Sequence, residues 1–174
     1  INLDALIIEK CELRKTENFK NEHYFIKDKV PLIIKWIQKQ SELTNEYLWG
    51  GTLGPNFDCS GLIQTAFFTH HIRIPRDAHQ IKSFCKHLFY LKEFNRKLEP
   101  GDLLFFGNKQ QCDHIGIYKG DGLYYHSSGK EFGRNGIGLD TLKETNHPIS
   151  LHYQSKLISA GKVIRGYRWD RTIR

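Results

Sequence analysis

The first strong pattern in the chain is a short apolar helix that follows a Gly-rich turn. Residues 50–55 (GGTLGP) are rich in glycine and end in proline, and neither residue type favours continuation of a helix. Residues 61–68 then place four apolar side chains at the spacing of one buried helical face: Leu62, Ile63, Ala66 and Phe67. The pattern therefore predicts that Cys59 lies at or near a helix N-terminus.

A second helical pattern precedes this turn. Residues 29–43 carry apolar side chains on one helical stripe, and Pro31 is tolerated in the first turn of a helix. We expect this helix to pack beneath the helix that starts near Cys59. Residues 1–28 contain strand-like apolar runs on either side of the polar stretch 14–22, and they show no catalytic pattern.

Three short strands are indicated in the second half of the chain. Leu98–Phe106 is a Pro-Gly turn that leads into an apolar strand, and Asp113–Tyr118 and Leu123–His126 read as two more. The turn between the last two, KGDG, contains the Asp-Gly pair typical of a hairpin. Such a hairpin brings His114 close to His126, which lies twelve positions further along.

The remaining segments are predicted from weaker patterns. A helix is expected after Asp77, running through Ile81 as far as Leu88. Residues 148–153 alternate like a strand, and residues 162–169 read as a closing strand.

The chemistry of Cys59 follows from its place in this pattern. Unpaired backbone N–H groups and the positive end of the helix dipole favour an anionic sulfur at a helix start. The alternative is a packed thiol, which is the usual fate of a free cysteine. A thiolate nucleophile needs a histidine base, and His114 and His126 offer a base and a residue that orients it. His126 can also be read as a strand histidine that bonds locally.

Composition limits the remaining choices. The chain has 174 residues, enough for a single domain with a substantial core, and carries a formal charge of +7. Its Lys and Arg residues are scattered, which favours ordinary solubilising charge over nucleic-acid binding and leaves a weak attraction to anionic wall polymers. The sequence contains no apolar run long enough for a transmembrane segment and no signal-peptide pattern at its start. The other three cysteines lack zinc-site spacing and are interpreted as packed thiols: Cys11, Cys85 and Cys112.

Several motifs together resemble the NlpC/P60 family of bacterial cell-wall cysteine peptidases. They are DCSGL, PGDLLFF, DHIGIY and the second histidine in YYHSS, with YLWGG and IPRDAHQ around the cysteine. The resemblance spans about residues 30–164 and implies a papain-like α+β fold, in which N-terminal helices pack on an antiparallel sheet. It also implies hydrolysis of the bond between γ-D-Glu and a diamino acid, meso-diaminopimelate or L-Lys, in peptidoglycan stem peptides.

The resemblance also assigns roles to individual residues. Cys59, His114 and His126 correspond to a catalytic triad, and Tyr47 would donate its hydroxyl to the developing oxyanion together with the backbone N–H of Cys59. Substrate-binding roles are implied for a further set of residues: Trp49, Asp58, Ser60 and Asp77.

Some of these residues have alternative interpretations. Trp49 can also be a core aromatic residue, and Asp58 and Ser60 can serve as helix caps.

Many relatives have Ser where this chain has Ala78. A hydroxyl donor to the substrate carboxylate is thus missing, and the exact stem-peptide preference stays open.

The expected mechanism needs no metal and no organic cofactor. An amidase or transacylase with the same triad and a non-catalytic wall-binding module remain as alternatives. We expect residues 1–28 to be an N-terminal arm or the remnant of an SH3-like domain, and residues 29–174 to be the catalytic domain of a monomer. The bacterial envelope fits the substrate, whereas muropeptide recycling in the cytoplasm fits the absence of an export signal.

Overall fold

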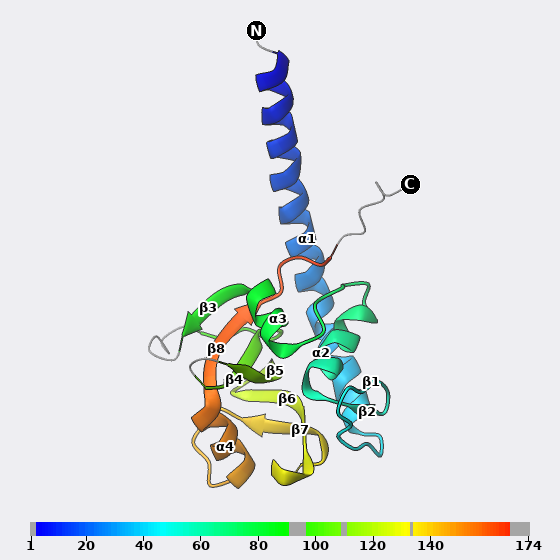
Figure 1. Ribbon diagram of the computed structural model, residues 1–174, viewed down its shortest axis with the longest axis vertical. Coiled ribbons are helices and arrows are strands. Elements are labelled where there is room, and N and C mark those ends of the chain that lie inside the picture. The colour runs from blue at the N-terminus through cyan, green and yellow to red at the C-terminus, as the bar shows by residue number, and fades with distance from the viewer. Residues whose placement is uncertain (1–2, 91–96, 109–110, 133, 168–174) are drawn as a thin grey trace.

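The computed structural model describes residues 3–90, 97–108, 111–132 and 134–167. One long helix, α1 (Leu3–Ser41), runs along the body of the molecule, and its N-terminal part projects beyond it (Figure 1). The other helices are α2 (Cys59–Phe68), α3 (Ala78–Phe84) and α4 (Pro148–Lys156), with a 3₁₀ turn at Lys130–Phe132.

A six-stranded antiparallel sheet forms the other half of the fold, in the order β3-β8-β4-β5-β6-β7. A separate two-stranded ribbon precedes α2. The strands are β1 (Thr52–Leu53), β2 (Asn56–Phe57), β3 (Lys86–Tyr90), β4 (Leu103–Gly107), β5 (Cys112–Gly120), β6 (Leu123–Ser128), β7 (Gly136–Thr141) and β8 (Leu157–Lys162). Helices packed on an antiparallel sheet make this an α+β fold, as expected from the sequence.

Strand β4 is buried on both faces, which explains its unbroken apolar sequence. Leu103 and Phe105 pack in the larger core, together with the apolar face of α2 and with Ile33 and Ile37 of α1. Burial of each such aliphatic side chain contributes about 1.5–3 kcal/mol. The predicted packing of the 29–43 helix against the Cys59 helix is thus confirmed.

The opposite face of β4 belongs to a second, smaller core. Leu104 and Phe106 lie there with Tyr124 of β6, Tyr153 of α4 and Leu157 at the start of β8. Because side chains alternate across a strand, one segment joins both cores. Helix α4 is therefore held against the face of the sheet that carries Phe106.

Two strand predictions were wrong because short apolar runs do not separate helix from strand. The two strand-like apolar runs on either side of the polar stretch 14–22 are helical, so that α1 begins 26 residues before the expected start at 29. The predicted strand at 148–153 is part of α4, which has Pro148 in its first turn, where a proline lacks no helical hydrogen bond.

Two element boundaries were also misplaced. Helix α3 ends at Phe84, and residues 86–88 of the predicted helix belong to β3. The closing strand is β8 at 157–162, not 162–169; residues 163–167 lie in no strand, and 168–169 lie outside the described residues. Strand β7 was not predicted; it begins within the Gly-rich stretch 132–138, whose composition is more typical of a turn than of a strand.

The division of the chain at residue 28 stays a prediction. Helix α1 passes through this position without a break. Among the helices that the structure describes, none combines the length and hydropathy needed to cross a membrane.

Candidate active site

Cys59 is the first residue of α2, and the turn before it is held by Asp58. The Asp58 side chain accepts a hydrogen bond from the backbone N–H of Gly61 (2.6 Å) and another from Gly50 (2.9 Å). It thereby caps the helix and ties it to the Gly-rich turn. Gly61 has no room for a side chain, because an added Cβ would overlap the carbonyl oxygen of Gly51.

The carboxylate of Asp58 is also paired with Arg76. The guanidinium donates from Nη1 to Oδ1 (3.1 Å) and from Nη2 to Oδ2 (2.5 Å), and Nη1 also donates to Ser60 Oγ (2.8 Å). Asp58 and Ser60 are both 6% exposed, so their polar atoms are engaged within the protein. The two residues are helix-capping and ion-pairing groups, and a role in substrate binding stays a prediction.

The thiol of Cys59 lies beside β5. Burial and the neighbouring Asp58 carboxylate raise its pKa to about 12, although the backbone N–H groups of Ile115 and Ser60 favour the thiolate. The helix start favours the thiolate, as expected from the sequence, but burial outweighs this effect in the free protein. Since Cys59 is 6% exposed and lies near a carboxylate, its thiol holds its proton at neutral pH.

His114 and His126 are brought together by the β5–β6 pairing. Ile117 faces Tyr125 in this ladder, which places His126 opposite Gly116 and diagonal to His114. The His114 Nε2 and His126 Nδ1 atoms lie 2.8 Å apart. An added Cβ on Gly116 would lie 3.4 Å from the His126 Cβ and 2.9 Å from the Tyr125 carbonyl oxygen, so glycine is needed at this crossing.

Asp140 of β7, which was not predicted from the sequence, continues this hydrogen-bonded line. His126 Nε2 lies 2.7 Å from Asp140 Oδ2. The Arg134 guanidinium and the Ser150 hydroxyl donate to the same carboxylate, with Arg134 Nη2 and Ser150 Oγ each 2.8 Å from Oδ1. Burial opposes ionisation of Asp140, but hydrogen bonds from His126, Arg134 and Ser150 lower its pKa below the usual range.

The charge on Asp140 fixes the protons of both histidines. A carboxylate only accepts hydrogen bonds, so His126 must donate through Nε2–H. Neutral His126 then presents an unprotonated Nδ1, which accepts from Nε2–H of His114. The Nδ1 of His114 is consequently left with its lone pair, as a base requires. Burial lowers the pKa of both imidazoles, so both rings are neutral at pH 7.

Tyr153 of α4 completes the walls around the two histidines. Its ring stacks on His114 with centroids 4.5 Å apart and meets His126 edge-on, also at 4.5 Å. Tyr153 was not predicted to be a site residue, because residues 148–153 were expected to form a strand. The packing holds the His114 ring in a plane that suits the hydrogen bond to His126.

Tyr47 lies close enough to Cys59 to be affected by its charge. Burial, with Cys59 and Asp58, raises the pKa of the Tyr47 phenol, which therefore keeps its proton and remains a hydrogen-bond donor. Trp49, only two residues further on, is 86% exposed, which excludes the core interpretation. Asp77 is exposed directly before α3, and its backbone N–H donates to Gln80 Oε1 at 3.4 Å.

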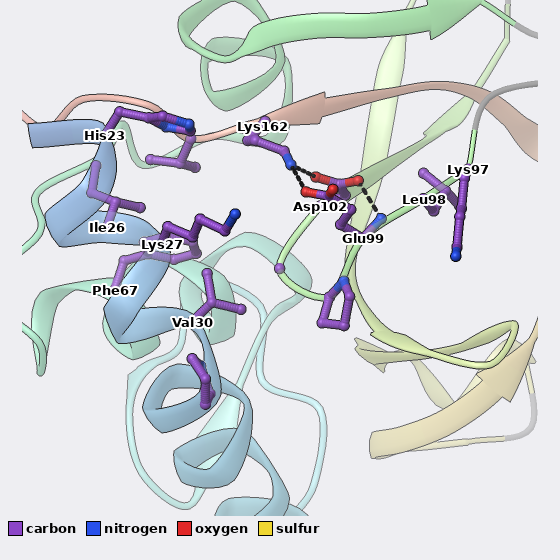
Figure 2. A pocket seen from close by; sticks show the side chains of 14 residues that line it. His23, Ile26, Lys27, Val30, Phe67, Lys97, Leu98, Glu99, Asp102 and Lys162 are labelled. Carbon is purple, nitrogen blue, oxygen red and sulfur yellow. Dashed lines mark hydrogen bonds and ion pairs between the residues drawn. The ribbon is translucent and has the colours of Figure 1, made fainter. Parts of the chain in front are cut away.

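A separate cavity of about 510 Å³ lies far from these residues, between α1 and the start of β4. Figure 2 shows Lys162 Nζ between the carboxylates of Glu99 (2.6 Å) and Asp102 (3.3 Å) in this cavity. Phe67 also lines it and lies eight positions after Cys59 in helix α2, a rise of about 12 Å. This cavity is therefore not part of the Cys59 site.

The cysteines and acidic residues give no indication of a metal centre in the described part of the chain. Cys59, Cys85 and Cys112 are free thiols, whereas the side chain of Cys11 lies outside the described residues. Within the described residues, His, Cys, Asp and Glu side chains form no group of three or more arranged to hold a metal ion.

Comparison with known proteins agrees with the motifs. Residues 44–155 match the model of the NlpC/P60 family. The chain is 31% identical over 134 residues to a dipeptidyl-peptidase 6 from Lysinibacillus sphaericus, covering 76% of this chain and 42% of the relative. It is 38% identical over 98 residues to a gamma-D-glutamyl-L-lysine dipeptidyl-peptidase from Bacillus cereus, covering 55% of this chain and 28% of that protein.

The fold also matches solved structures. A crystal structure of an NlpC/P60 family protein from Bacillus cereus superposes with a TM-score of 0.55 at 29% identity, covering 67% of this chain and 35% of that one. The chain thus spans less than half the length of these relatives.

Proposed function

Because the chain belongs to the NlpC/P60 family, we propose that it is a cysteine endopeptidase acting on peptidoglycan stem peptides. The bond hydrolysed is the one between γ-D-Glu and the diamino acid, meso-diaminopimelate or L-Lys. The observation that carries this proposal is the line of hydrogen bonds from His114 through His126 to Asp140, beside a cysteine at a helix start. A relative named for γ-D-glutamyl-L-lysine cleavage supports the choice of bond.

In the proposed mechanism, Cys59 attacks the carbonyl carbon of γ-D-Glu. The high pKa of the thiol and the low pKa of His114 mean that the proton moves from sulfur to His114 Nδ1 during attack, not before it. His114 then donates this proton to the leaving amine, and a water molecule hydrolyses the thioester. Neutral His126 orients His114, and the ionised Asp140 stabilises the positive charge that builds up on the pair.

The oxyanion of the tetrahedral intermediate would be held by two donors. The backbone N–H of Cys59 lies in the first turn of α2, where it has no partner within the helix. The Tyr47 phenol is protonated and close to Cys59, so it supplies the second donor. Trp49, Asp58, Ser60 and Asp77 are proposed to line the substrate-binding side of the cleft.

The functional unit is proposed to be residues 29–174. The stretch 1–28 would be an arm, and its helical form within α1 suits a connection better than the remnant of an SH3-like domain. The protein is proposed to act as a monomer.

Product analysis by mass spectrometry tests the proposed reaction. The substrates are L-Ala-γ-D-Glu-meso-diaminopimelate and its L-Lys counterpart, each incubated with the wild-type protein or the Cys59→Ala variant. We expect the free diamino acid to be released by the wild type only. Absence of release from both tripeptides and from intact sacculi would contradict peptidase activity, and an adduct formed only with added amine would indicate a transacylase.

A further inference from the structure

A polar pocket of about 650 Å³ lies between α3 and the first residues of β5. Its walls come from two parts of the chain that are distant in sequence. Helix α3 and the residues after it supply His79, Lys82, Ser83, Cys85 and His87, and the start of β5 supplies Gln111 and Cys112.

The pocket adjoins the catalytic histidine through Cys112. The Cys112 thiol donates to the carbonyl oxygen of His114 at 3.6 Å. Cys112 also lies close enough to Cys59 for its charge to raise the pKa of that thiol. Cys112 therefore connects the wall of the pocket to the backbone of His114 and to the surroundings of Cys59.

Lys82 is the permanent cation of this pocket. Among the described residues no hydrogen bond or ion pair engages its ammonium group. Burial raises the pKa of Cys112, and the charge of Lys82 offsets part of that rise. The nearest acidic residue in sequence to the β5 wall is Asp113. Asp113 is exposed, does not line the pocket, and lies near Gly107.

Lys82 also lies one helical turn after Ala78. Residues at i and i+4 lie on the same side of a helix, so Lys82 lies beside Ala78, whose side chain carries no hydroxyl. A stem peptide carries free carboxylates on D-Glu and on the diamino acid, close to the bond to be cleaved. A lysine in a half-open pocket binds such a carboxylate as a point charge.

We propose that this pocket is a carboxylate-binding subsite of the active site, with Lys82 as the cation and Gln111 and His79 as polar neighbours. The inference rests on the proposed function for the identity of its ligand, the stem peptide. In this proposal, Lys82 of α3 binds the substrate carboxylate, for which Ala78 provides no hydrogen-bond donor.

Binding measurements with the inactive Cys59→Ala protein test this directly. The ligands are L-Ala-γ-D-Glu-meso-diaminopimelate and two forms of it, one amidated at the D-Glu carboxylate and one at the side-chain carboxylate of the diamino acid. Lys82→Met is expected to weaken binding of the acid form about tenfold, as for a partly exposed charged hydrogen bond. Lys156→Met, which removes an equal charge from α4, is the matched control.

The two amidated ligands identify the carboxylate. The form lacking the relevant carboxylate should bind about tenfold more weakly than the acid form and should no longer respond to Lys82→Met. An equal response of all three ligands to Lys82→Met, or no response of any, would overturn the proposal. A loss that Lys156→Met reproduces would do the same, because it would reflect net charge alone.

Turnover by the wild type separates this inference from the proposed function. Cleavage of the acid tripeptide with no dependence on Lys82 would refute the subsite and leave the peptidase function standing. Binding that depends on Lys82 without cleavage would support the subsite and count against the peptidase function.

Discussion

Replacement of Asp140 by Asn tests the proton arrangement inferred for the two histidines. Asn has nearly the same shape but presents only one acceptor oxygen and an NH₂ group that donates. If the oxygen of the introduced amide still accepts the hydrogen bonds from Arg134 and Ser150, its NH₂ group faces His126 Nε2. That nitrogen must then become an acceptor. His126 would carry its proton on Nδ1 and donate to His114 Nε2, so that His114 is protonated on Nδ1 and has no lone pair for the thiol.

The expected loss in kcat/KM is about 100-fold, or about 2.7 kcal/mol of transition-state stabilisation. In a serine protease triad, the same Asp-to-Asn change directly beside the base costs about 10⁴-fold. Here Asp140 acts on the base His114 only through His126, so it stabilises the positive charge on His114 less strongly. A smaller loss is therefore expected here.

The change should also lower stability, with a defined pH dependence. The folded protein lowers the pKa of Asp140 below the value in the unfolded chain, about 3.9. Its contribution to stability is therefore fully present above pH 4–5 and is lost as the pH falls through the folded pKa. Asp140→Asn should unfold more readily at pH 7, by about 1–3 kcal/mol, and the difference from wild type should shrink on acidification.

Three measurements check these expectations: kcat/KM on the tripeptide, thermal unfolding between pH 3 and 7, and ¹⁵N chemical shifts of labelled histidines. The shifts report which ring nitrogen of His114 is protonated, which a purely structural role of Asp140 would not change. Asp121→Asn, in the exposed β5–β6 turn at a φ of 53° that Asn tolerates, is the matched control. Activity within threefold of wild type, or unchanged His114 shifts, would refute the proton arrangement.

The remaining predictions concern the nucleophile, the base and their support. Because burial lowers the pKa of His114, kcat/KM should stay constant from pH 8 down to pH 6.5 and fall only below pH 6.5. If the midpoint of the fall in kcat/KM lay above pH 6.5, His114 would be protonated in the free enzyme, which would contradict this expectation. Iodoacetamide should abolish activity whereas chelators should not. The alkylation rate of Cys59, followed by mass spectrometry, should rise about tenfold per pH unit from 7 to 9, and a plateau there would reveal a preformed thiolate. Gly116→Ala should displace His126 and the facing strand, destabilise the fold by about 1–3 kcal/mol and reduce kcat/KM. Urea unfolding and a tripeptide assay would measure the two effects. Wild-type values in both assays would contradict the close approach of β6 to Gly116.

The local elements around the site could be predicted from the sequence because their signals are local. The apolar face of residues 61–68 required a buried helix, and the glycines before it placed Cys59 at the start. The Asp-Gly turn set the β5–β6 hairpin, which brought His114 to His126. The motifs then pointed to the family that the comparison identifies.

Other features depended on contacts between distant segments. Asp140 lies on β7, which begins in a Gly-rich stretch and has no clear strand pattern in the sequence. Only the pairing of β7 with β6 places the Asp140 carboxylate beside His126. Tyr153 reaches His114 because α4 packs on the face of β4 that carries Phe106. Neither residue has a signal at fixed spacing from the cysteine.

The protonation of the nucleophile shows the same division most clearly. Sequence alone determined that a cysteine stands at a helix start, where the dipole favours a thiolate. Only the tertiary structure determined that the thiol is buried, which is the main cause of its raised pKa; the charge of Asp58, its neighbour in sequence, adds to the rise. Desolvation depends on the segments that pack around an atom, and the order of residues along the chain does not specify which segments those are.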